Sequence, residues 1–307
     1  MKNVEILLAV YNGETYLDEQ IQSILGQDSN AWHLTVSDDG SSDSSSDIID
    51  RYVREYPEQI SRVYSGKRFG NARDHFFWLM SQCDADYMQF CDQDDIWHSD
   101  KVRLLQEALE QAEKDFGEDM PLLVFSDQVV VDRDLNVLAP SLMKMQQQKP
   151  NATDFRNVLF QNIVTGCTSG INRALARLAD KCDIPSETIM HDWWLALVAA
   201  KFGRMVYVKN ATIDYRQHGK NSVGAKDTGS FSYFVYKITH LRSFRKTVIE
   251  KKNQASAFLK VYSDVLTEEE QSILRKFSAK RSGLRFKLSY CKWISTTMRK
   301  LGFIVRW

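Results

Sequence analysis

Two clusters of acidic residues are the part of the sequence best suited to chemistry. Asp38 and Asp39 follow one apolar run, and Asp92, Asp94 and Asp95 follow another further along the chain. Both clusters fall where a buried strand should end, and open α/β sheets bind ligands at the carboxyl ends of their strands. Neighbouring carboxylates repel one another unless a cation or hydrogen-bond donors lie between them. A divalent metal ion and a nucleotide base meet that need, so the clusters indicate a nucleoside diphosphate ligand.

The first cluster is expected to form a slot for a nucleotide base. Residues 9–13 (Ala-Val-Tyr-Asn-Gly) end one strand, and Asp38 and Asp39 end the next. A carboxylate there could accept a hydrogen bond from the N3–H of a pyrimidine, while the main chain near Ala9 and Tyr11 flanks the base. The alternative is a pair of ordinary turns, since Asn-Gly and Asp-Gly are common turn pairs.

The second cluster offers the ligands of a metal site. Asp92 and Asp94 alternate at the end of an extended strand, so both side chains could face one side. Hard oxygen ligands suit Mg²⁺ or Mn²⁺, and such an ion would neutralise charge on a departing diphosphate. The alternative is a helix N-terminus, where Asp94 and Asp95 would only favour the helix dipole.

A third motif places a carboxylate beside two indole rings. His191, Asp192, Trp193 and Trp194 open an apolar helix. The rings could contact the C–H face of a sugar, and the carboxylate could take a proton from a hydroxyl group as a general base. Spacing alone leaves a helix cap as an equal alternative for Asp192.

A fourth motif carries cationic groups. Arg216 and His218 alternate at the end of a late strand, so both could face the same site. Cationic donors beside a diphosphate would stabilise the leaving group. His218 could instead complete a metal site with Asp94, and an ordinary surface strand end is the remaining possibility.

The elements that position these motifs alternate between strand and helix. Strands are expected at residues 4–10, 33–37, 60–64 and 87–90, and helices at residues 16–25, 48–53, 71–81 and 100–115. This rhythm predicts an α/β fold with a mostly parallel central sheet flanked by helices. The later pattern is less regular, with strands expected at 122–125, 128–131, 166–171, 204–208 and 212–215, helices at 155–161 and 189–202, and a mobile loop at 140–151.

Length and composition indicate a folded protein in a reducing compartment. The chain has 307 residues, 43% of them hydrophobic, and five cysteines, which form no CxxC pair. A disulfide framework and a structural zinc site are therefore not expected. The first residues do not resemble a signal peptide, and no apolar run is long enough to cross a membrane.

The charge is divided between two regions. Residues 226–307 hold 18 Lys+Arg and 6 Asp+Glu, whereas residues 1–225 hold 22 and 34. This division predicts a catalytic domain of residues 1–222 and a basic, helical region of residues 223–307, with the boundary in the polar stretch 219–229.

The basic region mixes apolar and cationic side chains, which suits an anionic membrane surface. The expected apolar anchors are Phe277, Leu284, Phe286, Leu288, Tyr290, Trp293 and Ile294. A helical pair that covers the core or forms a homodimer is the alternative. Nucleic acid is not expected as a partner, because the acidic cleft would repel its phosphates.

Together these motifs resemble glycosyltransferase family 2, whose members have the GT-A fold. The resemblance covers roughly residues 3–222 and rests on residues 9–13, 38–41, 92–95, 191–194 and 216–218. It implies that Asp38 or Asp39 holds the nucleotide base, with Tyr11 and Ala9 beside it. Arg68 and Asn71 occupy a segment that often lines the nucleotide in such enzymes.

The resemblance also implies roles for the other motifs. Asp92 and Asp94 look like the DxD pair that binds ribose and metal. Asp192 matches the aspartate of the ED-type motif, which is the base of inverting enzymes, and His191 replaces the usual glutamate.

The resemblance also implies roles for the motif at residues 216–218 and for residues near the metal site and Asp192. Arg216 looks like a diphosphate contact and His218 like a second metal ligand. Asp95, Trp193 and Trp194 are expected on the side of the sugar and the acceptor.

The resulting prediction is an inverting glycosyltransferase that depends on Mn²⁺ or Mg²⁺. Similarity to bacterial rhamnosyltransferases implies dTDP-L-rhamnose as the nucleotide-sugar donor, with UDP-glucose or UDP-galactose as alternatives. The expected acceptor is a cell-surface polysaccharide or a lipid-linked glycan. The expected location is cytoplasmic, peripheral at the inner face of the cell membrane.

Two other functions are weighed against this one. A nucleotidyltransferase would need a glycine-rich basic loop after the first strand, but residues 9–16 hold one glycine and neither lysine nor arginine. A non-catalytic module that binds a glycan or a nucleotide-sugar would have no need for a base at Asp192.

Overall fold

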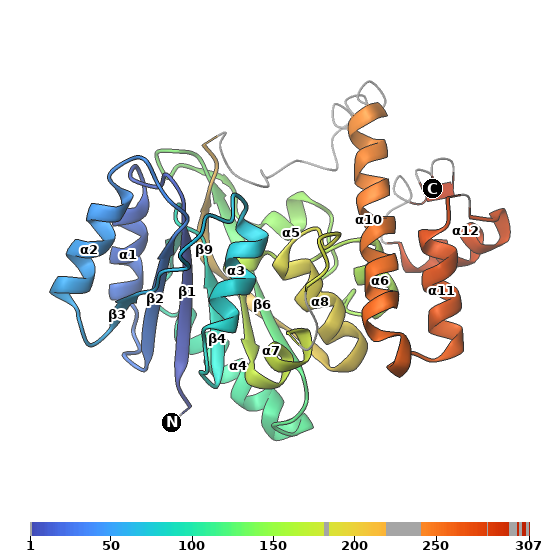
Figure 1. Ribbon diagram of the computed structural model, residues 1–307, viewed down its shortest axis with the longest axis horizontal. Coiled ribbons are helices and arrows are strands. Elements are labelled where there is room, and N and C mark those ends of the chain that lie inside the picture. The colour runs from blue at the N-terminus through green and yellow to red at the C-terminus, as the bar shows by residue number, and fades with distance from the viewer. Residues whose placement is uncertain are drawn as a thin grey trace.

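The strand-forming runs assemble into one mixed sheet (Figure 1). The computed structural model describes residues 2–180, 184–218, 241–280, 282–294, 300, 303–304 and 307. The strands in this part of the chain are β1 (Val4–Val10), β2 (Trp32–Asp38), β3 (Ile60–Arg62), β4 (Tyr87–Cys91), β5 (Ile96–Trp97), β6 (Leu122–Val131), β7 (Val137–Ala139), β8 (Ser169–Asn172) and β9 (Arg204–Arg216). Their order is β3-β2-β1-β4-β8-β6-β9-β5, and β7 pairs with β6 beside this row.

The first half of the sheet is parallel, and its register brings the expected motifs to one edge. Val10 of β1 pairs with Asp38 of β2, and Leu8 pairs with Cys91 of β4. The chain therefore leaves β1, β2 and β4 at the same edge of the sheet, as a set of parallel strands requires. Beyond β4 the antiparallel strand β8 intervenes, so the sheet is mixed.

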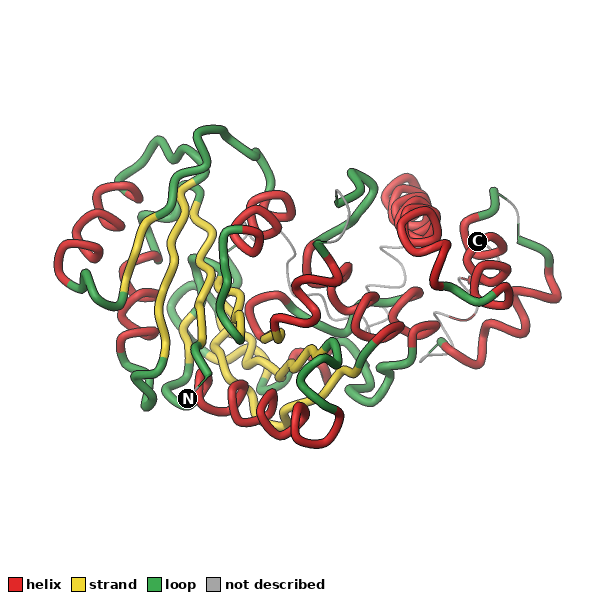
Figure 2. The backbone as a smooth tube through the Cα atoms, turned by 60° about the horizontal axis from the view of Figure 1, so that its bottom comes forward, coloured by secondary structure: helices red, strands yellow, loops and turns green. Residues whose placement is uncertain are grey.

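Helices cover both faces of the sheet because their apolar side chains recur at helical spacing. The described helices are α1 (Leu17–Leu25), α2 (Ser45–Glu55), α3 (Ala72–Ser81), α4 (Lys101–Phe116), α5 (Leu142–Met145), α6 (Phe155–Phe160), α7 (Arg173–Ala179), α8 (His191–Phe202), α10 (Leu241–Tyr262), α11 (Glu268–Ser278) and α12 (Leu284–Tyr290). Helices α1, α2 and α4 share one apolar cluster, and α3 and α8 share the other. Figure 2 shows helices on both sides of the twisted strands.

Two pairs of expected strands are single strands in the structure. Residues 122–131 form β6 without a break, and residues 204–216 form β9. The polar residues Ser126 and Asp127 in the middle of β6 led to the prediction of two strands. In the structure both side chains form buried hydrogen bonds, so the strand continues through them. The Ser126 hydroxyl lies 2.6 Å from that of Thr212, and Asp127 accepts hydrogen bonds from the Ser141 hydroxyl and from the main-chain N–H of Met143.

The segment expected to be a mobile loop contains the short helix α5. Asp127 anchors its beginning through Ser141 and Met143, and the Ser141 side chain caps the helix. The sequence interpretation also omits β5, β7 and α7. All three are short, and short elements give little periodicity to detect.

The carboxyl-terminal helices pack onto the side of the molecule that carries α6 and α8 (Figure 1). Phe258 of α10 contacts Trp194, with ring centroids 5.5 Å apart, and the Lys251 ammonium group donates to the Phe160 carbonyl oxygen at 2.6 Å. The expected boundary at residues 219–229 lies outside the described residues.

The structure corrects the list of apolar anchors. Phe277, Tyr290 and Ile294 are buried in the core, whereas Leu284 and Leu288 are 61% and 55% exposed. Phe286 and Trp293 are half-buried against the same core. No described helix is long and apolar enough to span a bilayer.

Candidate active site

The loop after β1 is fixed by the second aspartate cluster. The Tyr11 main-chain N–H donates to Oε1 of Gln93 at 2.8 Å, and the Gln93 amide donates back to the Tyr11 carbonyl oxygen at 3.1 Å. Gly13 leaves room for this contact, because a Cβ there would lie 2.6 Å from the same Oε1. The two loops are therefore built as one unit, with the exposed Tyr11 ring above them.

The two aspartates of the first cluster, Asp38 and Asp39, accept hydrogen bonds from different segments. Asp38 accepts hydrogen bonds from the main chain and hydroxyl of Ser41, at 3.0 and 2.5 Å, so it shapes the turn that leads to α2. Asp39 accepts from the main-chain N–H groups of Phe69 and Gly70. Its carboxylate thereby joins the end of β2 to the segment before α3. Ala9, one strand away, pairs with Ser37 at the same edge.

Of the two residues expected to line the nucleotide, only Arg68 is turned toward the first loop. Its guanidinium group lies 4.6 Å from the centre of the Tyr11 ring, which is a cation–π contact. Asn71 instead caps α3: its side-chain oxygen accepts from the main-chain N–H of Asp74, and its amide donates to Asp74. The position of Asn71 is explained by the helix start, as expected for a residue of this type.

Asp94 and His218 are brought together from positions far apart in the sequence. Oδ2 of Asp94 lies 2.7 Å from Nε2 of His218. The His218 ring also packs against Tyr16, with centroids 4.8 Å apart. One carboxylate oxygen and one imidazole nitrogen so placed are suitable ligands for a divalent cation.

Arg216 is buried beneath this pair, which corrects the expectation of a diphosphate contact. Its guanidinium group donates to the main-chain oxygens of Asp94 and Arg133, at 3.1 and 2.8 Å, and to the carboxylate of Glu19 at 2.5 Å. Its side chain is 3% exposed. Arg216 therefore supports the loop that carries Asp94.

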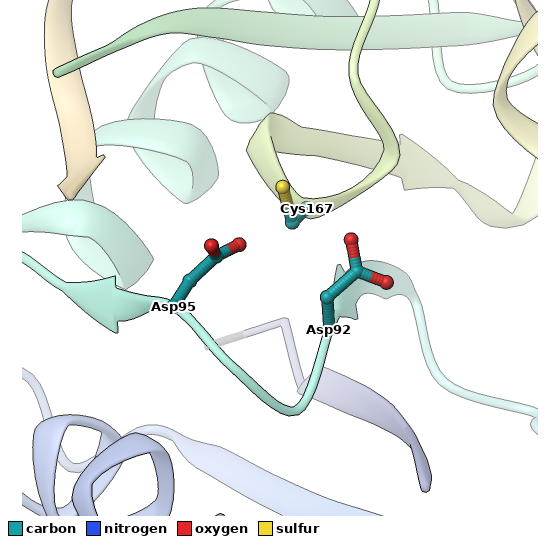
Figure 3. A group of neighbouring side chains, drawn as sticks. All are labelled: Asp92, Asp95 and Cys167. Atoms are coloured by element: carbon teal, nitrogen blue, oxygen red, sulfur yellow. The ribbon is translucent and has the colours of Figure 1, made fainter. Parts of the chain in front are cut away.

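Asp92 and Asp95 face Cys167 across a small space (Figure 3). Each of the three residues offers one ligand atom, and these atoms lie within 4.8 Å of one another. Burial and the nearby Asp94 raise the pKa of Asp92 to about 7, and the same causes hold the pKa of Asp95 well above its usual range. The acidic loop therefore favours an added positive charge, and its oxygen atoms fit Mg²⁺ or Mn²⁺.

Asp95 is deeper in the fold than expected for a contact to a sugar. It is fully buried, and its Oδ1 accepts the main-chain N–H of Arg216 at 3.2 Å. The carboxylate joins the aspartate loop to the end of β9, and this packing leaves it no surface for an acceptor.

Asp192 lies in the first turn of α8 and is held by a turn from the neighbouring strand. Its Oδ2 accepts the main-chain N–H of Gly166 at 3.0 Å. Gly166 belongs to the short 3₁₀ turn Gly166–Thr168 that leads into β8. Burial raises the pKa of Asp192 to about 7, although hydrogen bonds to Trp193 and Gly166 oppose the shift. A carboxylate that titrates near neutrality is suited to general-base catalysis.

His191 is a neutral spacer beside Asp192. Its ring is enclosed by Phe76 and Phe90, at centroid distances of 4.2 and 5.1 Å, and burial lowers its pKa to about 3. A Cβ on Gly166 would lie 2.6 Å from its Nε2, so the glycine lets the turn close over the imidazole.

The two tryptophans after Asp192 pack into the protein. Trp194 is 1% exposed and packs edge-on against Phe258 and at a tilt against Tyr262, which corrects its expected role as a sugar contact. Trp193 is half-buried, and its indole N–H donates to the Val158 carbonyl oxygen at 2.7 Å. The helix buries apolar residues all round because it lies between the sheet and α10.

Three residues that organise the site were given no role in the sequence interpretation. Gln93 lies between Asp92 and Asp94, so its position in this motif could have indicated a role in the site. Gly166 gives only the weak signal of a glycine near a strand. Lys101 follows the aspartate cluster, and a lysine at a helix start is ordinarily a surface residue.

Fold and site together define a glycosyltransferase with the GT-A fold. The model of the family described as glycosyl transferase family 2 matches residues 5–178, and the chain belongs to that family. It is 27% identical over 255 residues to the dTDP-rhamnosyl transferase RfbG of Shigella flexneri, covering 80% of this chain and 83% of that protein.

Two solved structures show the same fold. TarS residues 1–349 of S. aureus gives a TM-score of 0.56 at 13% identity, covering 93% of this chain and 82% of that one. The mannosyltransferase PcManGT of Pyrobaculum calidifontis, in complex with GDP-Man and Mn²⁺, gives 0.54 at 13% identity, covering 98% and 74%.

Proposed function

We propose that this glycosyltransferase inverts the configuration of the transferred sugar and uses Asp192 as its general base. The observation that carries the proposal is the carboxylate of Asp192, which belongs to a half-buried residue, accepts the Gly166 N–H and has a pKa raised to about 7. The turn that contacts Asp192 through Gly166 also contains Cys167, which faces Asp92 and Asp95. Asp192 is therefore connected to the acidic loop through this turn.

The reaction is a single displacement. Asp192 takes the proton of an acceptor hydroxyl group while the oxygen forms a bond to the anomeric carbon of the donor. The bond from that carbon to the diphosphate breaks, and its electron pair leaves with the nucleoside diphosphate. Attack from the face opposite the leaving group inverts the anomeric centre.

The nucleotide-binding side is formed by the loops after β1, β2 and β4. We place the base beside Asp39, Tyr11 and Arg68, and the ribose near Asp92. Asp94 and His218 would hold the divalent ion, which when bound would neutralise the negative charge that develops on the diphosphate.

The pH dependence of kcat/KM should follow the ionisation of Asp192. The base works only when deprotonated, and its pKa is raised to about 7. We therefore expect kcat/KM to rise tenfold per pH unit below the pKa and to level off above it. Steady-state rates between pH 5 and 9 at saturating Mn²⁺ would check this, and a profile flat across neutrality would contradict it.

The donor we propose is dTDP-L-rhamnose, supported by the similarity to RfbG. The proposed acceptor is a cell-surface polysaccharide or a lipid-linked glycan. Release of nucleoside diphosphate should be measured with dTDP-rhamnose, UDP-glucose, UDP-galactose and GDP-mannose, each with Mn²⁺, Mg²⁺ or EDTA. Metal-dependent release from one donor would name the sugar. Tight nucleotide binding without release from any donor, with lipid extract present, would favour a binding module.

We further propose that the basic region, residues 223–307, holds the catalytic domain, residues 1–222, at the inner membrane surface. Leu284 and Leu288 lie one turn apart on the exposed face of α12, with the exposed cations Arg285 and Lys292 beside them. Such a face fits an anionic bilayer.

Vesicle binding tests this surface. The double variant Leu284→Glu/Leu288→Glu should weaken co-sedimentation with phosphatidylglycerol vesicles by about tenfold or more, because two apolar contacts are lost and negative charge is added. The matched control is Val265→Glu, which alters an apolar residue that is 63% exposed outside α12. Equal binding by both variants would contradict the proposal, and concentration-dependent sedimentation without vesicles would favour a homodimer.

A further inference from the structure

A fully buried lysine lies beneath the acidic loop. Lys101 is the first residue of α4, and its ammonium group donates to the Cys167 carbonyl oxygen at 2.5 Å and lies 3.1 Å from the centre of the Trp97 ring. The location is costly for a cation, because burial removes its hydration and a helix N-terminus repels positive charge. Burial lowers the pKa of Lys101 to about 8.

The negative groups around Lys101 compensate for this cost. The carboxylates of Asp92 and Asp95 favour the charged form of Lys101 and so oppose the lowering of its pKa. The hydrogen bond to the Cys167 carbonyl oxygen and the contact with the Trp97 ring are the direct contacts that hold the ammonium group.

Lys101 is also connected to the candidate base by a short series of hydrogen bonds. Its ammonium group binds the carbonyl oxygen of Cys167, the middle residue of the turn Gly166–Thr168. The N–H of Gly166, in the same turn, binds Oδ2 of Asp192 at 3.0 Å. A shift of the turn would move the donor that fixes the base.

We propose that Lys101 is a positioning residue for the transfer reaction: it fixes the turn Gly166–Thr168, and thereby Asp192. The inference rests on the proposed role of Asp192 as the base. It assigns to Lys101 no contact with the substrates.

The test compares Lys101→Met with a matched buried lysine. Lys252 also donates to a main-chain oxygen, that of Ala279 at 2.8 Å, and lies over a tryptophan ring, that of Trp307 at 5.5 Å. It is in α10, outside the site. Methionine is one atom shorter than lysine, keeps most of the apolar side chain and removes the charge, so both variants lose a similar buried interaction.

We expect Lys101→Met to lower kcat by about 100-fold with a smaller change in the donor KM, the effect of a small displacement of a catalytic group. Lys252→Met should lower the melting temperature without this loss, and Lys101→Arg should recover most of kcat. If Lys101→Met does not fold, Lys101→Gln carries the same comparison. Unchanged kcat in a folded variant lacking the charge would overturn the proposal.

Hydrogen exchange separates this result from a failure of the proposed function. The segment 164–170 should exchange faster in Lys101→Met than in the unaltered protein and Lys252→Met, whether or not a donor sugar has been found. Unaltered exchange there would overturn the positioning role. Faster exchange without any detectable transfer by the unaltered protein would leave the contact established and refute the proposed reaction.

Discussion

Asp192→Asn should lower kcat by about 10²–10⁴-fold, the range for removing a general base. Asparagine has nearly the same shape and can still accept the Gly166 N–H, but it cannot take the acceptor proton. The dissociation constant of the nucleoside diphosphate should change little, because the proposed contacts to the nucleotide base come from the loops after β1 and β2. Single-turnover rates and calorimetry of nucleotide binding measure the two effects separately.

The control for this variant is Asp180→Asn. Asp180 is an exposed aspartate that follows α7 outside the site, and partial desolvation also raises its pKa. We expect it to leave kcat unaltered. Near-normal turnover by Asp192→Asn would show that another group is the base.

Asp94→Ala should reduce both Mn²⁺ affinity and kcat/KM by about 100-fold or more, since a bound ion contributes several kcal/mol of charge stabilisation. The carboxylate lost is the one 2.7 Å from Nε2 of His218. Mn²⁺ binding followed by electron paramagnetic resonance gives a readout that does not depend on turnover.

A second histidine–aspartate pair provides the control. Nε2 of His98 lies 2.9 Å from Oδ1 of Asp214, so Asp214→Ala removes a similar contact. The Asp214→Ala variant should have a lower free energy of unfolding and an unaltered affinity for Mn²⁺. Equal Mn²⁺ affinity in Asp94→Ala and the unaltered protein would rule out the assignment of Asp94 as a ligand, and full activity in EDTA would rule out metal dependence.

The strands and loops on the proposed nucleotide side could be predicted because their signals are local. The strands with these apolar runs end at Val10, Asp38 and Cys91, and parallel pairing then brings the following loops to one edge. The contact between Asp94 and His218 could be anticipated in the same way, since both follow strands.

The acceptor side could not be predicted to the same depth, because its contacts join distant segments. The hydrogen bond from Gly166 to Asp192 depends on β8 running antiparallel beside β4, which no local pattern records. Trp194 and Arg216 have side chains typical of a binding site. Both are buried because helices and loops from elsewhere in the chain cover them.

The contact between Trp194 and Phe258 limits how freely the carboxyl-terminal helices can be exchanged. Trp194 lies two residues after Asp192 on α8, and its ring packs against Phe258 and Tyr262 of α10. A chimaera that joined residues 1–222 to the helices of a relative would have to preserve these ring contacts, or α8, which carries Asp192, would lose packing on that side. Removing the carboxyl-terminal helices would therefore expose the Trp194 ring, so these helices are part of the packing that supports α8.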